Sequence, residues 1–473
     1  EHQMNLEFYK AFGRTSPSLP LQNGGNIVHG NATRINWEEV CPKEDGDEIY
    51  ILGNPPYQGK SKQLDSQKND MKFVFNGVDN YKSLDYISCW FFLGSKYIKN
   101  INAKLAFVST NSLCQGEQVS LLWSHIFNIN IEISFAYQSF KWQNNAKDNA
   151  GVSVVIIGLR NVSNEKKFIF NENIKKESKN INAYLINSSE IIITKQSKSI
   201  SNLPNMMSGN KPVDGGNLIF SEEEKNLILL KNPNSSKYIK KFMGADEFMN
   251  GKLRYCLWIE DNQVDDANNN ELIMKRIEET KKFRLSSKDI GANQLAVKSH
   301  KFRDFYSTQT TSIVIPQTGS ERREYLPIGF VDGSVIISNA ARVIYNAEAW
   351  IMGLLSSKIH MVWVRIVAGR MKMDMQYSNT ICYNTFPFPN ISQKQKDEIT
   401  ELVFAILDER EKHSQKTLAQ LYDPDKMPEG LKKAHHNLDI AIEQCYRSKP
   451  FESDEERLEY LFKMYEDITS KEV

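Results

Sequence analysis

The sequence predicts an α/β region, then a mixed α+β region, and a small all-α region at the carboxyl end. Up to about residue 164, short apolar runs alternate with helix-like stretches, which is typical of a largely parallel sheet with covered faces. The middle of the chain mixes strand-like and helical segments, whereas beyond residue 390 apolar residues recur only at helical spacing. A chain of 473 residues is long enough for about three domains. We therefore expect domains at 1–165, 166–390 and 391–473.

The first region is expected to contain two buried strands, two helices and a final pair of strands. In chain order these are the strand 49–52, the helix 84–99, the strand 105–108, the helix 118–127 and the β-rich segments 129–137 and 152–159. A polar loop without a helix joins the last two segments. We therefore expect them to form an antiparallel pair at the edge of the sheet.

In the rest of the chain, a polar stretch marks a domain boundary, and capping boxes and a proline mark the starts of helices. A polar stretch from residue 164 to about residue 201 indicates a domain boundary. Beyond it, a capping box at 221–224 starts a helix, and two strand-like segments and an apolar helix are expected at 312–316, 335–338 and 350–367. In the last region, Pro428 fits a first helical turn and Ser453 begins a second capping box, so we expect helices only.

The composition excludes several classes of protein. Lys plus Arg number 59 against 58 Asp plus Glu, so any basic surface for a polyanion must be local. No run of 18 apolar residues and no signal sequence is present, which predicts no membrane association. The six cysteines form no C-x-x-C pair, which argues against metal and disulfides and fits the reducing cytoplasm. Because Glu1 starts in a mid-helix pattern, we expect the chain to be part of a longer polypeptide.

The most informative motif is Asn54-Pro55-Pro56-Tyr57, which follows directly on the strand 49–52. A planar amine is a poor nucleophile, because its lone pair is delocalised into the ring or carbonyl. Acceptors on the Asn54 side chain and the Pro55 carbonyl could draw the lone pair out, and the prolines would hold both acceptors in place. Tyr57 offers a flat face on which an extruded base can stack. The motif therefore predicts methyl transfer to an amino nitrogen, without a metal.

The cofactor site is less complete in the sequence. Asn31, in Gly30-Asn31-Ala32 before Trp37, could line a cofactor pocket, but an ordinary loop Asn explains it equally well. No Gly-x-Gly follows a strand, although such a loop would hold the methionine part of a methyl donor. We expect this half of the donor site to lie before Glu1.

Several motifs together resemble one family. With Ile51-Leu52-Gly53 before it and Gln58-Gly59-Lys60 after it, the Asn54 motif resembles that of the γ-class adenine-specific DNA methyltransferases. Nearly the whole chain resembles the MmeI-type (Type IIL) fused restriction–modification enzymes. The motifs that carry this second resemblance are Ser16–Leu21, Gly30–Ala32 with Trp37, Phe140–Trp142 followed by Val152–Gly158, Phe248, Arg254–Trp258, Gly369–Lys372, Tyr377–Ser378, Tyr383–Pro387 and Leu418–Pro424.

The resemblance implies methyl transfer from S-adenosylmethionine to the exocyclic amine of adenine in a specific double-stranded DNA sequence. The first region would be the C-terminal half of a Rossmann-like class I methyltransferase sheet, followed by a target-recognition domain and a helical C-terminal domain. The catalytic residues would be Asn54, Pro55, Pro56 and Tyr57, and Asn31 and Asn54 would contact the cofactor. The resemblance also implies an N-terminal nuclease and a cofactor-binding region on the same polypeptide, and neither is found in this sequence.

A basic segment is a candidate for contacts to the DNA backbone. Between Lys275 and Arg303, nine Lys and Arg stand against three acidic residues, which predicts phosphate contacts. For residues 275–284, a solvated helix face with ion pairs four residues apart explains the pattern equally well. The backbone candidates are Lys298, Lys301, Arg303, Arg322, Arg323 and Arg370.

The resemblance also implies that the stretch after Arg370 reads bases. The matching positions, Lys372, Asp374 and Gln376, are spaced by two, which places them on one side of an extended segment. Lys can donate to O6 and N7 of guanine, and Asp can accept from the amino group of the paired cytosine. We therefore expect guanine at one outer position of the recognised site. Surface charges on a loop are the alternative.

Other functions remain open at this point. Asn-Pro also starts ordinary turns. A protein glutamine side chain presents the same kind of amide nitrogen, although an enzyme for glutamine would not need the long remainder of this chain. Enzymes that methylate the cytosine amine usually have Ser in place of Asn54. The chain could also recognise DNA without catalysis, because no glycine loop for a donor is visible.

Overall fold

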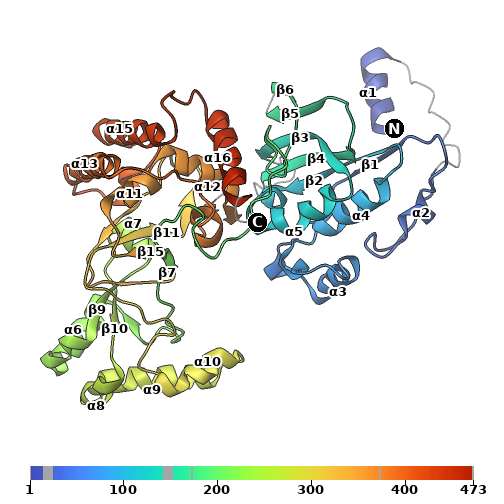
Figure 1. The fold of residues 1–473 in the computed structure, drawn as a ribbon. Coiled ribbons are helices and arrows are strands. Elements are labelled where there is room, and N and C mark those ends of the chain that lie inside the picture. Colours follow the sequence, from blue (N-terminus) through green and yellow to red (C-terminus); the bar gives the residue numbers. More distant parts are fainter. Residues whose placement is uncertain (1, 14–24, 142–152, 172–173, 372–373, 471–473) are drawn as a thin grey trace.

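The computed structural model describes residues 2–13, 25–141, 153–171, 174–371 and 374–470. Figure 1 shows two bodies, one built around a large sheet and the other extended, with C-terminal helices at one end and helices α6 and α8–α10 at the other. Of the residues in the sequence motifs, Ser16–Leu21, Trp142, Val152 and Lys372 lie outside the described residues.

The first body is built on a six-stranded sheet in the order β1-β2-β4-β3-β5-β6. Its strands are β1 (Ile49–Gly53), β2 (Ala103–Thr110), β3 (Ile131–Lys141), β4 (Ser153–Asn161), β5 (Lys167–Asn171) and β6 (Ile174–Ser178). β1 runs parallel to β2 and β3 parallel to β5, whereas the other neighbours are antiparallel. The predicted antiparallel pair is confirmed as β3 and β4, but it lies inside the sheet, so the expectation of a largely parallel sheet with this pair at its edge was wrong.

The sheet also continues beyond residue 165, where the sequence suggested the end of the first domain. β5 and β6 are hydrogen-bonded into it and end at Ser178. The four residues 174–177 of β6 are exposed, because β6 is an edge strand. Polar residues are common on such edges, so the composition of this segment looks like a linker. The predicted boundary at 164–201 therefore begins inside the sheet.

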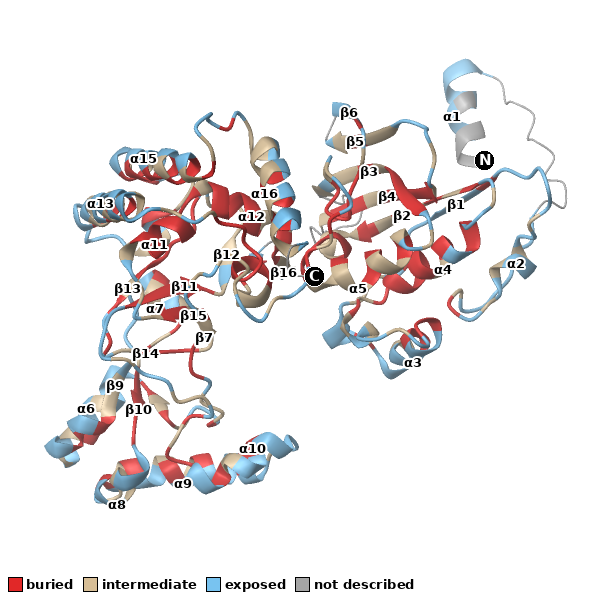
Figure 2. Cartoon of the chain, viewed as in Figure 1, coloured by how far each residue is buried: buried red, intermediate tan, exposed pale blue. Residues whose placement is uncertain are grey.

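Helices cover one face of this sheet, and the apolar core of the first body lies between them and the strands. The first body contains α1 (His2–Phe12), α2 (Trp37–Val40), α3 (Asp65–Val74), α4 (Ser88–Ile98) and α5 (Gly116–Phe127). Figure 1 shows α4 and α5 beneath the strands, and Figure 2 shows their buried residues turned toward the sheet. A Cβ atom on Gly94 would lie 2.2 Å from Leu105 Cδ1, so α4 approaches β2 closely at this position. The predicted helices at 84–99 and 118–127 are confirmed.

The middle of the chain forms three small sheets, in the orders β14-β9-β10-β8, β13-β11-β15-β7 and β12-β17-β16. The strands are β7 (Met207–Ser208), β8 (Ile219–Phe220), β9 (Ile239–Met243), β10 (Tyr255–Leu257), β11 (Ser312–Pro316), β12 (Thr318–Ser320), β13 (Gly329–Val331), β14 (Ile336–Ile337), β15 (Ala341–Tyr345), β16 (Gly369–Met371) and β17 (Asp374–Gln376). The helices are α6 (Glu222–Lys231), α7 (Ala245–Asn250), α8 (Val264–Ala267), α9 (Glu271–Leu285) and α10 (Ile290–Gln294). The predicted capping box at Ser221 and the strand at 312–316 are confirmed.

The apolar stretch 350–367 forms two helices, not the single helix expected. α11 (Ala349–Leu355) and α12 (Lys358–Val367) meet at a bend of 56°. The Ser357 side chain accepts the backbone N–H of His360 and caps α12, and serine favours such ends over helix interiors. No single helix in the described ranges is long and apolar enough to cross a membrane; only α11 and α12 together meet that test, and they are largely buried.

The C-terminal region is helical, as predicted. It contains α13 (Gln393–Glu411), α14 (Leu418–Leu421), α15 (Glu429–Tyr446) and α16 (Asp454–Thr469). The predicted apolar faces pack inward, since Ile399, Leu431 and Leu461 are buried. One continuous apolar core joins these helices to α11, α12 and the first body.

A buried carboxyl group joins the C-terminal helices to the middle region and gives a prediction for pH dependence. The Tyr325 hydroxyl donates to Asp439 Oδ2 at 2.8 Å and the Lys358 N–H donates to Oδ1 at 2.6 Å. Burial nevertheless raises the pKa of Asp439 to about 7. The pKa of an unfolded Asp is about 3.9, so between these values the native state binds more protons and its stability falls as the pH rises.

We expect the substitution Asp439→Asn to remove this pH-dependent loss, which amounts to roughly 3 kcal/mol between about pH 4 and pH 7. Urea unfolding at several pH values gives the free energy of unfolding at each pH. The slope of this free energy against pH is then compared between the variant and the native protein. Asp425→Asn is the matched control, because Asp425 is 66% exposed. Parallel pH profiles for Asp439→Asn and the native protein would contradict the assignment.

Candidate active site and DNA-recognition surface

The Asn54 motif lies at the carboxyl end of β1, at the edge of the sheet where ligands of α/β proteins bind. Pro55 is buried, and Asn54 is exposed. Among the described residues the Asn54 side chain has no hydrogen-bond partner, so its amide is available to a ligand. Tyr57 is half-buried and packs against the apolar core. The segment thus presents one free amide beside a buried proline.

A second segment holds the loop that follows the motif. Tyr86 N–H donates to the Gln58 carbonyl at 2.9 Å. The Asp85 carboxylate accepts the Ser112 hydroxyl at 2.6 Å and the backbone N–H of Lys60. Burial raises the pKa of Asp85, although these hydrogen bonds oppose the shift. Sequence reasoning missed Asp85 and Ser112, because neither stands in a motif and only the fold brings them together.

Asn31 is held within its own loop. Its Nδ2 donates to Asp70 Oδ2 at 2.9 Å, and its Oδ1 accepts the backbone N–H of Thr33 at 3.0 Å and the Thr33 hydroxyl at 2.8 Å. Asp70 also accepts Arg34 Nε at 2.8 Å and the Tyr86 hydroxyl at 2.7 Å. Burial alone would raise the pKa of Asp70, but the hydrogen bonds from Tyr86, Arg34 and Asn31 outweigh it and the pKa is lowered. A role of Asn31 in cofactor binding stays a prediction, since most of its amide is engaged here.

The base-reading candidates lie on a small hairpin. β17 is the central strand between β16 and β12, with Asp374 opposite Met371 and Ser320. Asp374 and Gln376 point to one side, and Met375 between them is buried. Thr318 Oγ1 donates to Gln376 Oε1 at 3.3 Å, while Gln376 Nε2 has no partner among the described residues. The expected shared side is thus found for Asp374 and Gln376, and Lys372 lies outside the described residues.

Two of the three arginines proposed for the DNA backbone near this hairpin, Arg322 and Arg370, have ion-pair partners. Arg370 pairs with Glu321, and its Nη2 donates to the Arg365 carbonyl at 3.2 Å. Burial lowers the pKa of Arg370 and of Arg323. Arg322 pairs with Asp425 at 2.7 Å, but this pair is solvent-exposed and easily exchanged. Of the three, Arg322 is the one most open to a phosphate.

Several residues of the basic segment near α9 and α10 form ion pairs within the protein. Asp261 accepts Lys298 at 3.1 Å and Lys301 at 3.2 Å. Arg303 pairs with Asp304 at 3.0 Å. Hydrogen bonds from His300, Lys298 and Lys301 lower the pKa of Asp261. A count of nine basic residues therefore overstates the positive charge offered here, because acidic residues just outside the counted range, such as Asp261 and Asp304, pair with several of them.

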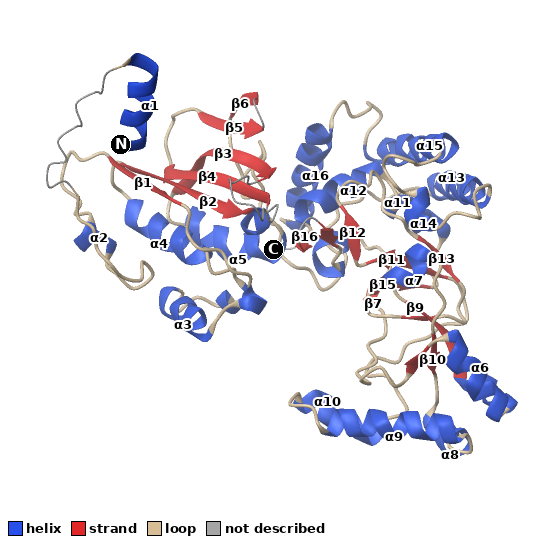
Figure 3. Ribbon diagram, turned by 180° about the vertical axis from the view of Figure 1, so that it is seen from behind, coloured by secondary structure: helices blue, strands red, loops and turns tan. Residues whose placement is uncertain are grey.

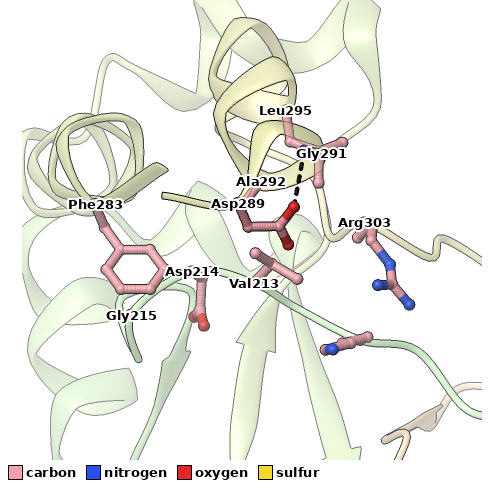
Figure 4. A pocket seen from close by; sticks show the side chains of 10 residues that line it. Val213, Asp214, Gly215, Phe283, Asp289, Gly291, Ala292, Leu295 and Arg303 are labelled. Atoms are coloured by element: carbon pink, nitrogen blue, oxygen red, sulfur yellow. Dashed lines mark hydrogen bonds between the residues drawn. The ribbon is translucent and has the colours of Figure 1, made fainter. Parts of the chain in front are cut away.

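A shallow pocket of about 550 Å³ lies beside this segment. Figure 4 shows Phe283 from α9, Asp289 before α10, and Arg303 around it, with the Asp289 carboxylate accepting the Gly291 N–H. Figure 1 places α9 and α10 at the end of the second body, away from β1. The pocket is therefore separate from the Asn54 loop. The described residues include no cluster of three or more His, Cys, Asp or Glu that could hold a metal ion.

Three family models match successive parts of the chain. Residues 1–171 match the MmeI DNA-methyltransferase domain, residues 187–390 the MmeI target recognition domain, and residues 391–473 the MmeI C-terminal domain. The chain is therefore made of MmeI-type domains.

Two known proteins resemble the chain closely. DNA methyltransferase A of Bacillus subtilis (strain 168) is 48% identical over 473 residues, which are 100% of this chain and 54% of that protein. The structure of the Type IIL restriction-modification enzyme MmeI in complex with DNA is 40% identical, with a TM-score of 0.89 over 99% of this chain and 63% of that one. The chain spans about half the length of the curated relative. These matches confirm the order of an α/β methyltransferase sheet, a mixed recognition domain and a helical domain.

Proposed function

We propose that this chain carries the catalytic loop and the recognition domain of a site-specific DNA adenine methyltransferase, within a restriction–modification enzyme. The observation that carries the proposal is the free Asn54 amide beside the buried Pro55 at the carboxyl end of β1. A recognition domain and a methyltransferase domain on one chain support DNA as the substrate. The similarity to MmeI, whose structure contains DNA, supports a double-stranded partner.

The residues of the loop would act on an amine brought out of the helix. Asn54 Oδ1 and the Pro55 carbonyl would accept the two amino hydrogens of the flipped base and favour a tetrahedral nitrogen, which can attack a methyl group. Tyr57 would stack on the base and hold it in place. The proton that the nitrogen loses would leave through these acceptors to water. S-adenosylmethionine would supply the methyl group, on a positively charged sulfur.

Only part of the donor site is supported by this chain. Asn54 is free to contact a donor, whereas no Gly-x-Gly loop follows a strand. In the described ranges β1 pairs only with β2, and its side chains Tyr50 and Leu52 are 60% and 78% exposed. An open strand with exposed apolar residues accepts a further strand readily. We propose that a cofactor-binding region pairs with this edge of β1, and that an N-terminal nuclease belongs to the same polypeptide.

Methylation-sensitive sequencing of DNA from cells that carry the intact gene tests the function directly. We expect methylated adenine in one sequence context. A methylated cytosine amine, or no modified base, would reject the proposal. Calorimetry with S-adenosylmethionine tests the main alternative, in which this chain recognises DNA without catalysis. Donor binding by the chain alone would exclude that alternative.

Base reading gives a further prediction. We expect the double substitution Lys372→Glu with Asp374→Arg to change one outer position of the methylated sequence from guanine to cytosine. Arg can donate to guanine on the opposite strand, and Glu can accept from the cytosine amine. Sequencing of methylated sites measures the change, and Lys412→Glu with Asp408→Arg on α13 is the control of equal charge. An unaltered preference in the first variant would rule out these readers.

A further inference from the structure

The first turn of α5 contacts both the catalytic loop and the recognition hairpin. Three successive residues make contacts there. Gly116 packs on the hairpin, and Gln118 binds the segment that holds the catalytic loop. Glu117 between them pairs with Lys195, which lies in the chain between β6 and β7. Figure 3 shows β16 beside this end of α5.

On the hairpin side the contact is close. Gly116 has φ +56°, and a Cβ atom there would lie 3.1 Å from Gly369 Cα and 3.2 Å from Gly369 N. Gly369 begins β16, which pairs with the reading strand β17. A side chain at position 116 would therefore push the hairpin away from α5.

On the catalytic side the contact is made of hydrogen bonds. Gln118 Oε1 accepts the Asp85 N–H at 3.0 Å, and Gln118 Nε2 donates to the Ser83 carbonyl at 2.7 Å. Asp85 in turn accepts the backbone N–H of Lys60, three residues beyond Tyr57. One side chain thus fixes the short segment on which the catalytic loop rests.

We propose that the first turn of α5 sets the position of the catalytic loop relative to the recognition hairpin, with Gln118 and Asp85 as positioning residues. The inference rests on the proposed function, because it concerns the same loop. Packed side chains and hydrogen bonds between rigid elements can transmit a shift from one site to another. A displacement of about 1 Å at a reacting group can lower a rate about a hundredfold. Correct base reading at the hairpin would then be coupled to the placement of Asn54.

Kinetics of the full gene product test the role of Gln118. We expect Gln118→Ala to lower kcat by about tenfold to a hundredfold, with the Kd for the same duplex within about threefold of the native value. Gln118→Glu keeps the acceptor for Asp85 but loses the donor to Ser83, so it should restore part of the rate. Ser120→Ala is the matched control, because its hydroxyl bonds only to the Glu117 carbonyl of its own helix. A native kcat in folded Gln118→Ala would overturn the proposal.

Hydrogen exchange supplies a measurement that does not need activity. In this chain without DNA, we expect Gln118→Ala and Gly116→Ala to raise exchange at residues 57–63 at least about threefold, because the segment that supports them loosens. Gly77→Ala is the control for Gly116→Ala: Gly77 has φ +81°, and nothing lies within 4 Å of its Cβ position. Native exchange in both variants would overturn the inference. If the native enzyme transferred no methyl group, the proposed function would be wrong. Hydrogen exchange at residues 57–63 would still show whether the first turn of α5 holds the Asn54 loop in place.

Discussion

Replacing Asn54 by alanine is expected to lower the rate of methyl transfer by about a hundredfold to a thousandfold. The substitution removes one of two acceptors aimed at the amino hydrogens, and the loss of one such fixed polar group costs about this factor. DNA affinity should change little, because Asn54 is one exposed side chain outside the recognition domain. Single-turnover transfer of a labelled methyl group to DNA by the full gene product measures the rate.

The control for Asn54→Ala is Asn76→Ala, which changes the same residue type at another exposed position of the same domain. It should leave the rate unchanged. Tyr57→Phe keeps the flat ring and should also retain most activity, whereas Tyr57→Ala loses the stacking face, worth about 1–3 kcal/mol per base. A rate for Asn54→Ala within about threefold of native would show that the free amide takes no part in the reaction.

Replacing Arg284 by methionine is expected to destabilise the part of the second body around α9 and α10 by about 4 kcal/mol or more. Arg284 is fully buried and its guanidinium donates to five backbone carbonyls, of Pro212, Val213, Leu295, Lys298 and Lys301, at 2.7–2.9 Å. Methionine fills similar space but removes the donor that these carbonyls share. The Lys298 carbonyl keeps the Lys301 N–H at 3.0 Å, and each carbonyl that stays buried without a donor costs about 1–3 kcal/mol.

Arg284 also holds an unfavourable backbone conformation. Val213 has φ +52°, and a β-branched residue in this left-handed region costs about 1–3 kcal/mol. Arg284 Nε donates to the Val213 carbonyl at 2.7 Å and so helps to hold Val213 in this conformation. Without Arg284, the backbone at Val213 would be free to move to a more favourable φ. Hydrogen exchange in increasing urea measures the stability of residues 211–303. Lys281→Met on the same helix is the control, since Lys281 is exposed. Equal protection in Arg284→Met and the native chain would disprove this structural role.

The sequence was most informative where local signals coincide. The strand 49–52 and the motif after it were predicted together, because an apolar run followed by two prolines leaves few alternatives. Ser221 and Ser453 marked helix starts for the same local reason: the serine side chain bonds to an N–H of its own first turn. The predicted capping box is complete at Ser221, whereas at Ser453 the Glu456 side chain accepts the Glu452 N–H instead. By contrast, Ser356 and Ser357 were read as part of one helix, since their break depends on how two helices pack.

Charge was predicted least well. Lys298, Lys301 and Arg303 were counted as free cations, although Asp261 and Asp304 lie against them in the fold. Arg284 was counted in the same basic run and proved to be a buried structural group. A basic residue contributes to a surface only after its neighbours are known, and sequence spacing does not give those neighbours.

By itself the sequence predicted the chemistry proposed for the Asn54 loop, since Asn54, its prolines and Tyr57 are contiguous and their strand is local. It also determined the order of the domains, because apolar periodicity is a property of each segment. Only the tertiary structure decided what supports that loop: Ser112 and Gln118 lie close together in the sequence, and the fold brings both to Asp85. The same holds for the contact of Gly116 with Gly369, because a long-range approach of two backbones leaves no periodic signal in either segment.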